Sequence, residues 1–214
     1  VIPVFETMFK DMGASLPAPT PIVVNMSRFV KSSIHYMIGA LVIIVFMFKR
    51  YYKTEKGKRK IDSLVLKAPI FGILTIKASV ARVTRTLATL LSSGVAILES
   101  LLIVAKVAGN KVVEESLLVA RSRISEGRSM SEPLQESGVF PPMVVQMIEV
   151  GESTGALDNM LNKIADFYEE DVDTLVTNLT AMMEPMIMMF LGVILGGLII
   201  AMYLPIFKLG SAVG

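Results

Sequence analysis

The fold is decided by the stretch LDNMLNKIADFYEEDVDTLVTNLTAMMEPMIMMFLGVILGGLIIAMYL, Leu157–Leu204, in which a helical repeat runs into a membrane span. Apolar residues recur in its first half at steps of three and four, which places them along one side of an α-helix. The repeat comprises Leu157, Leu161, Ile164, Tyr168, Val172, Leu175 and Leu179. No Gly or Pro interrupts the chain from Ala156 until Pro185. We therefore predict one helix of roughly 70 Å, at about 1.5 Å per residue, that leaves a bundle and enters the membrane.

Two segments are apolar enough to span a bilayer. Met186–Leu204 contains no Asp, Glu, Lys or Arg across 19 residues, and Ser32–Phe48 contains none across 17. A hydrocarbon core of about 30 Å requires roughly 20 apolar helical residues. Between Lys49 and Lys60, directly after the first span, seven basic residues stand against one acid. The positive-inside rule therefore predicts that the region between the spans is cytoplasmic.

The composition of the chain excludes several classes of function. The chain is 53% hydrophobic with a mean hydropathy of +0.62, more apolar than an ordinary soluble domain. It has no cysteine and a single histidine, His35, so disulfides and thiolate chemistry are excluded and we expect no metal or other cofactor. From Ile61 to Ala181 there are 10 basic and 15 acidic residues, and this acidic balance argues against binding of nucleic acid.

We predict an all-α fold: an antiparallel cytoplasmic bundle of about six helices, flanked by two transmembrane helices and continuous with the second of them. The IPVF sequence at Ile2–Phe5 is similar to LPIF at Leu204–Phe207, which suggests that another span precedes the first residue. The expected segments are an extracytoplasmic segment (1–30), a transmembrane helix (31–48), a basic cytoplasmic linker (49–67), the bundle (68–181), a transmembrane helix (182–204) and a periplasmic tail (205–214).

Local signals mark where several bundle helices begin and end. One apolar stripe runs from Ile76 to Leu90, and Gly94 follows it. Asn110 is a candidate N-cap for a helix that spans Lys111–Glu126, and Ser131 is a candidate N-cap for a short helical turn.

The sequence GESTG, Gly151–Gly155, matches the G-x-S-x-G pattern of serine hydrolases, but its surroundings favour another interpretation. A nucleophile elbow requires a strand before the serine and a histidine base. Here the preceding residues are helical in pattern, and His35 lies in a predicted span. We predict a helix-to-helix corner, in which Gly151 closes one helix in the left-handed conformation and Gly155 packs closely against a neighbour. Ser153 or Thr154 would then accept hydrogen bonds from the first amides of the next helix.

Two further groups of residues are candidate sites. Four acids share one face of the long helix and could serve a cation or a basic partner, although a solvated helix face is the more common arrangement. They are Asp166, Glu169, Glu170 and Asp173. In the second span Gly192, Gly196 and Gly197 place small residues on one face, which suits close helix packing either within the chain or with another subunit. The chain has no G-x-x-x-x-G-K-[ST] motif, so any nucleotide hydrolysis would be the work of a partner.

Four ordered stretches carry further motifs: RTLATLLSSGVAILESL (Arg85–Leu101), FPPMVVQMIEVGESTGALDNML (Phe140–Leu161), ADFYEEDVD (Ala165–Asp173) and AMYLPIFKLG (Ala201–Gly210). Together they resemble the bacterial inner-membrane platform proteins that type II secretion systems and type IV pili share. The most recognisable string of that family is carried here by Phe140, Pro141, Pro142, Gly151, Glu152, Thr154 and Gly155. The C-terminal stretch is more similar to the pilus branch than to the secretion branch.

The resemblance implies a scaffold of the inner membrane and no enzymatic activity. It corresponds to the second of two similar cytoplasmic domains together with its flanking spans. The implied partners are the assembly or retraction ATPase, pilins, other inner-membrane pilus proteins, membrane lipid and further copies of the chain. The platform of a type II secretion system and, in another class, a membrane transporter are the alternatives. The arginines that we nominate for contact with ATPase or pilin are Arg82, Arg85, Arg121 and Arg123.

Overall fold

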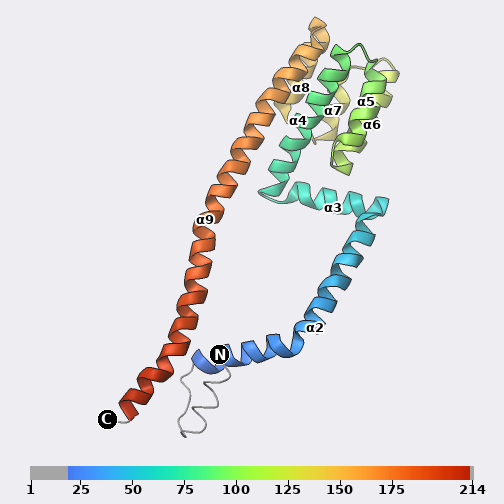
Figure 1. The fold of residues 1–214 in the computed structure, drawn as a ribbon. Coiled ribbons are helices and arrows are strands. Elements are labelled where there is room, and N and C mark those ends of the chain that lie inside the picture. The colour runs from blue at the N-terminus through green and yellow to red at the C-terminus, as the bar shows by residue number, and fades with distance from the viewer. Residues whose placement is uncertain (1–18, 213–214) are drawn as a thin grey trace. The chain divides into compact units, whose positions relative to one another are not determined.

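The structure is a computed structural model that describes residues 19–212, so the similarity at Ile2–Phe5 lies outside the described residues. Within this range the chain forms eight helices and no strand, which confirms the all-α prediction (Figure 1). The helices are α2 (Pro19–Tyr52), α3 (Glu55–Lys67), α4 (Phe71–Ser92), α5 (Ile97–Val107), α6 (Lys111–Ser125), α7 (Ser131–Ser137), α8 (Pro142–Thr154) and α9 (Leu157–Ala212). They belong to two units: a bundle unit of residues 49–179, and a unit that contains residues up to 48 and from 180 onward.

Helices α2 and α9 are each long and apolar enough to cross a membrane, as the sequence predicts. Both helices extend beyond the expected spans. Helix α2 begins at Pro19, twelve residues before the expected start at residue 31, because no Gly or Pro interrupts it between Pro21 and Gly39. Helix α9 continues past Leu204 to Ala212. At about 1.5 Å per residue its 56 residues are roughly 84 Å long, and Pro185 does not end it.

The bundle unit is built from antiparallel helices that share one core. Consecutive helices from α4 to α9 run in alternating directions (Figure 1), and short turns join them. Helix α4 packs against α5, α5 against α6, α6 against α7, and α7 against α8. The fully buried positions include Leu87, Leu101, Leu117, Leu134, Val144, Leu161 and Ile164. The first turns of α9 therefore belong to the core of the bundle, and the same helix continues into the uncharged apolar run Met186–Leu204.

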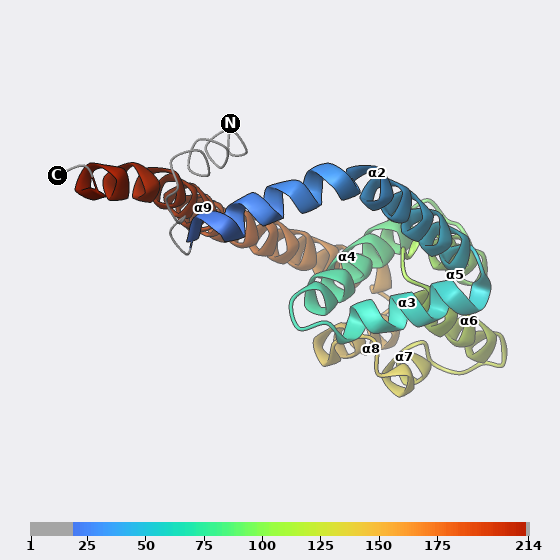
Figure 2. The ribbon, with the colours of Figure 1, turned by 90° about the horizontal axis from the view of Figure 1, so that it is seen from below.

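Helix α3 replaces most of the expected linker at 49–67. Thr54 caps it, because its Oγ1 accepts from the backbone N–H of Gly57 at 3.1 Å. Figures 1 and 2 show α3 lying across one end of the bundle, and α3 packs against α4 and α6. The chain bends by 110° between α3 and α4. The sequence predicted a basic linker here, whereas the structure has a helix with one face packed against the bundle.

Helix α6 begins as the sequence predicts. The Oδ1 atom of Asn110 accepts from the backbone N–H groups of Val112 and Val113, at 2.9 and 3.4 Å. A second side chain, which the sequence did not predict, also caps this helix. Asp62 of α3 is only 5% exposed and its Oδ2 accepts from the backbone N–H of Lys111 at 2.7 Å, so a residue 49 positions away completes the cap.

Candidate functional site

The GESTG sequence forms the corner between α8 and α9, which confirms the predicted helix-to-helix turn. The two glycines have the opposite roles to those we expected. Gly155 has the left-handed conformation, with φ of 70°, and ends α8. The backbone N–H of Ala156 donates to the carbonyl of Gly151 at 2.9 Å, and that of Gly155 donates to the carbonyl of Glu152 at 3.4 Å. This pair of bonds is the Schellman motif.

Gly151 is the close-packing residue of the corner. It is buried within the last turns of α8. A Cβ atom at this position would lie 2.9 Å from the Cα of Leu157 and 3.2 Å from the Cβ and Cγ of Met160. The first contact is with backbone, so the start of α9 would have to move. Around Gly155, in contrast, a Cβ would meet no atom within 4 Å.

Glu152 holds the beginning of α7. Its Oε1 accepts from the backbone N–H of Met130 at 2.7 Å, and its Oε2 accepts from the Oγ of Ser129 at 2.5 Å and the backbone N–H of Ser131 at 3.3 Å. Ser131 is the first residue of α7 and does not cap it, contrary to our prediction. A carboxylate of the motif therefore satisfies the free amides of another helix, where the helix dipole also favours a negative charge.

Ser153 is not placed as a nucleophile. It lies on helix α8, its side chain is exposed, and its Oγ donates to the carbonyl of Val150 at 3.0 Å. The Oγ1 of Thr154 donates to the same carbonyl at 2.7 Å, so neither hydroxyl accepts from the first amides of α9 as we had predicted. His35 lies on α2, in the other unit.

The other half of the family string starts α8. Phe140 is 7% exposed and belongs to the core. The carbonyl of Pro141 accepts from the backbone N–H of Val144 at 3.0 Å, and Pro142 is the first helical residue, where the missing N–H of proline costs no helix bond. The motif residues at both ends of α8 therefore set the boundaries and the packing of this helix.

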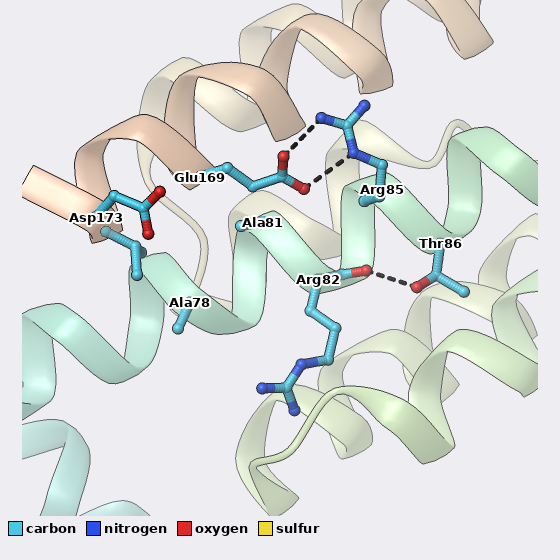
Figure 3. Close-up of a pocket in the computed structure, with 8 residues that line it drawn as sticks. Ala78, Ala81, Arg82, Arg85, Thr86, Glu169 and Asp173 are labelled. Atoms are coloured by element: carbon cyan, nitrogen blue, oxygen red, sulfur yellow. Dashed lines mark hydrogen bonds and ion pairs between the residues drawn. The ribbon is translucent and has the colours of Figure 1, made fainter. Parts of the chain in front are cut away.

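Arg85 joins α4 to α9 and is the centre of the best-defined polar cluster of the bundle (Figure 3). Its Nε and Nη2 donate to the two carboxylate oxygens of Glu169 at 2.9 and 2.8 Å, a bidentate pair. Its Nη1 donates to Oδ1 of Asn162 at 3.1 Å, and its Nη2 also pairs with Asp166. These bonds raise the pKa of Arg85 above its ordinary value, and the same pair lowers the pKa of Glu169.

The groove beside this cluster is lined by α4 and α9. Arg82 also lines it, but its guanidinium points away from the Arg85–Glu169 pair, as Figure 3 shows. Arg82 instead donates through Nη1 to the carbonyl of Val107 at the end of α5, at 3.4 Å. Asp173 lines the same groove on the α9 side. Neighbouring arginines of one helix thus serve two different partners.

The structure separates the four nominated arginines. Arg121, on α6, donates through Nε to the carbonyl of Leu98 at 2.8 Å and is half-buried. Arg123, on the same helix, pairs only loosely with Glu126, at 3.9 Å. Arg82 and Arg85 lie on α4. Arg85 and Arg121 therefore have short internal contacts, whereas the internal contacts of Arg82 and Arg123 are long, at 3.4 and 3.9 Å, which leaves these two better placed to contact another protein.

The acidic face of α9 is partly used inside the bundle. Asp166 and Glu169 pair with Arg85, while Glu170 and Asp173 are exposed and form no ion pair among the described residues. The neighbouring Asp171 pairs with Lys77 of α4 at 2.6 Å. In the described part of the chain no group of three or more His, Asp or Glu residues is arranged to hold a metal ion. The cluster therefore attaches α9 to α4.

The glycine face of the second span is open. A Cβ built on Gly192, Gly196 or Gly197 would meet no other atom within 4 Å among residues 19–212. The close packing that these glycines permit is therefore not used by the described part of this chain.

We expect Arg85→Met to lower the free energy of unfolding by about 1 kcal/mol, which is the upper part of the range for solvent-accessible ion pairs. The effect is not larger because 37% of the Arg85 side chain is exposed and water screens its pairs. The measurement is thermal unfolding of the chain in detergent micelles at neutral pH. Arg123→Met is the matched control and is expected to change the free energy by less than about 0.5 kcal/mol.

The same comparison has an expected pH dependence. The pKa of Glu169 is lower in the folded state than in the unfolded state, so its ionised form stabilises the folded chain. This stabilisation is fully present above the ordinary carboxyl pKa and is lost as the pH falls and Glu169 becomes protonated. The difference between wild type and Arg85→Met should therefore disappear as the pH falls from about 4 through the lowered pKa. A difference that persisted in strong acid would show that packing of the arginine stem, and not its charge, carries the effect.

Comparison with known proteins places this architecture among assembly and secretion proteins. A family model described as type II secretion system (T2SS), protein F, matches residues 83–205, more than half of the chain. The type IV pilus assembly protein PilC of Myxococcus xanthus (strain DK1622) is 49% identical over 213 residues, which cover 100% of this chain and 51% of the relative.

Two proteins of Pseudomonas aeruginosa represent the two branches. Its type IV pilus assembly protein PilC is 44% identical over 215 residues, covering 100% of this chain and 58% of the relative. Its type II secretion system protein F is 31% identical over 214 residues, which cover 100% of this chain and 53% of that relative. The chain spans about half the length of the curated relatives it matches.

Proposed function

Because the chain belongs to the type II secretion system protein F family, we propose that it is the second half of an inner-membrane platform for assembly of type IV pili. Its greater identity to the pilus assembly relatives than to the secretion relatives supports the pilus branch. The platform of a type II secretion system is the second candidate within the same family. The protein is a multi-pass protein of the inner membrane.

The observation that carries this proposal is the unbroken helix α9. One end of α9 contributes Leu161, Ile164 and Tyr168 to the bundle core, and the other end is the apolar segment. A helix that is packed at one end and embedded at the other can transmit a displacement of the bundle to the membrane. In this proposal a cytoplasmic ATPase moves the bundle, α9 carries the movement, and a pilin leaves the membrane to join the filament.

The orientation of the chain and its partners are part of the same proposal. The basic residues between Lys49 and Lys60 support a cytoplasmic bundle, so the residues before α2 and those from 205 onward would be periplasmic. Arg82, which is exposed, and Arg123, which is half-buried, are the positions at which we would first test crosslinking to the ATPase. The open glycine face of α9 is proposed to pack against another membrane helix, from a pilin or from a second copy.

The coupling role of α9 is tested by a flexible insertion. We expect a Gly-Ser-Gly-Ser insertion after Thr180, made in the full-length protein, to abolish surface pili because it breaks the helix between the bundle and the span. The same insertion at Gly127, in the exposed turn between α6 and α7, is the control and should leave pili on the cell. Immunoblots of membrane fractions must show equal protein levels. Normal piliation with the Thr180 insertion would refute transmission through α9.

A membrane transporter is the alternative from another class. It predicts paired ionisable residues or broken helices near the bilayer midplane. Among the described residues, the run from Met186 to Leu204 carries no charge and α9 is unbroken there. A deletion strain separates the two classes: the platform predicts loss of pili with normal solute uptake, and the transporter predicts the reverse.

A further inference from the structure

The outer face of α3 carries a stripe of basic residues that contains one apolar side chain. Lys56, Lys60, Leu64 and Lys67 follow one another at steps of four, four and three residues, so they share one side of the helix. All four side chains are exposed, and Leu64 is 71% exposed. None of the three lysines forms an ion pair with a carboxylate in the part of the chain that the structure describes.

The opposite side of α3 is already occupied by the bundle. Asp62 is buried against the start of α6, Glu55 pairs with Lys111 at 3.1 Å, and Arg59 pairs with Glu115 at 2.9 Å. The acids of α3 are therefore engaged with α6. What remains on the outer face is basic. A groove along the border between α3 and α6 is lined by Arg59, Lys60, Ser63, Leu64, Lys67 and Val112.

Large apolar side chains continue this surface around the corner into α4. Ile70, Phe71 and Ile73 are 54%, 65% and 51% exposed, within and directly after the turn that follows α3. Exposed apolar groups that adjoin a row of unpaired lysines form the pattern of helices that lie in a membrane interface, where lysines reach anionic headgroups and apolar groups enter the acyl boundary.

The covalent connection keeps this surface close to the bilayer. Only Lys53 and Thr54 separate the end of α2 from the start of α3. The uncharged part of α2 ends at Phe48, and the four helical residues that follow rise only about 6 Å. Helix α3 therefore begins within about a Debye length of the headgroups, the range over which anionic lipids attract basic residues.

We infer that α3 and the α3–α4 corner dock onto the surface of the membrane and recognise anionic phospholipid. Lys56, Lys60 and Lys67 contact lipid phosphates, while Leu64 and Phe71 insert into the upper acyl region. This contact fixes the end of the bundle that α3 covers against the bilayer. It rests on the first span and the bundle alone, so it holds whether or not the chain assembles pili.

The absence of cysteine from the sequence makes a direct depth measurement possible. Nitroxide labels are attached to Leu64→Cys or Phe71→Cys in the whole chain, reconstituted into nanodiscs of phosphatidylcholine alone or with about a third phosphatidylglycerol. A label at Val119→Cys, on the exposed side of α6, is the aqueous reference. Collision with oxygen reports lipid, and collision with a nickel chelate reports water. We expect the first two labels to become oxygen-accessible in the anionic nanodiscs, and the reference to stay accessible to nickel.

Charge removal tests the role of the lysines. Each lysine near an anionic surface contributes about fivefold to the docking equilibrium, so replacing Lys56, Lys60 and Lys67 with Gln should lower the ratio of docked to undocked chain on the order of a hundredfold. Lys106→Gln with Lys163→Gln, two exposed lysines on α5 and α9, should leave that ratio unchanged. The inference fails if both labels remain nickel-accessible with phosphatidylglycerol, as they would if an acidic protein were the occupant. It also fails if the triple variant keeps the depth of the wild type.

Discussion

Gly151→Leu is expected to lower the free energy of unfolding of the bundle by about 3 kcal/mol, the upper range for overpacking a buried site. Leucine favours a helix over glycine by about 0.8 kcal/mol, so helix propensity alone predicts stabilisation. The steric term wins because even the first atom of the side chain would lie 2.9 Å from the Cα of Leu157, and that backbone is fixed by the Schellman bonds of the corner. Gly151→Ala should show the same sign with a smaller loss of about 1 kcal/mol.

Two variants in the same corner separate close packing from backbone strain. Gly155→Ala has open space but a φ of 70°, so it should cost about 1 kcal/mol through strain alone. Ser153→Ala removes only an exposed hydroxyl and should stay within about 0.5 kcal/mol of wild type. Thermal unfolding in micelles gives the order, and surface pili can be counted for the same variants in the full-length protein. If Gly155→Ala proved more damaging than Gly151→Leu, the assignment of the two glycines would be wrong.

Glu152→Ala is expected to cost about 2 kcal/mol, because it removes a charged acceptor from two backbone amides and one hydroxyl at the start of α7. The loss should be local. Helix α7, Ser131–Ser137, should lose protection against hydrogen exchange before the rest of the bundle. Glu152→Gln keeps one acceptor oxygen but no charge, so its loss should be about half as large.

A matched acid on the same helix controls for net charge. Glu149 lies three residues before Glu152 on α8 and is exposed. Glu149→Ala should leave both the stability of the chain and the exchange of α7 unchanged. Equal exchange of α7 in Glu152→Ala and Glu149→Ala would contradict the capping role of Glu152.

The sequence predicted well those features that depend on neighbouring residues. Apolar spacing located α4 and α9, the uncharged runs located both candidate spans, and the short polar side chain of Asn110 correctly marked the start of α6. In each case the physical cause acts within about a turn of helix or across one continuous apolar run.

Features that depend on docking of distant segments could not be predicted. Glu152 and Met130 are 22 residues apart, and Arg85 and Glu169 are 84 apart, so the sequence gives no spacing by which to pair them. The roles of the two corner glycines were exchanged because both can adopt a positive φ. Only the positions of Leu157 and Met160 show which glycine lacks room for a side chain. The buried face of α3 was missed because nothing in the sequence distinguishes Asp62, the one buried acid of this helix, from the exposed charged residues around it.

The unbroken course of α9 has a consequence for the lengths that this protein can tolerate. Each residue added to or removed from an uninterrupted helix turns everything beyond it by about 100° around the axis. Deletion of one residue between Leu179 and Met186 would therefore turn the face that carries Gly192, Gly196 and Gly197 by about 100° relative to the apolar stripe that includes Leu161. Deletion of all seven residues from Leu179 to Pro185, about two full turns, would nearly restore the original angle. We therefore expect that deletions whose length is close to a whole number of helical turns are tolerated and that other lengths are not. A series of deletions of increasing length, each scored for surface pili, would test this periodicity.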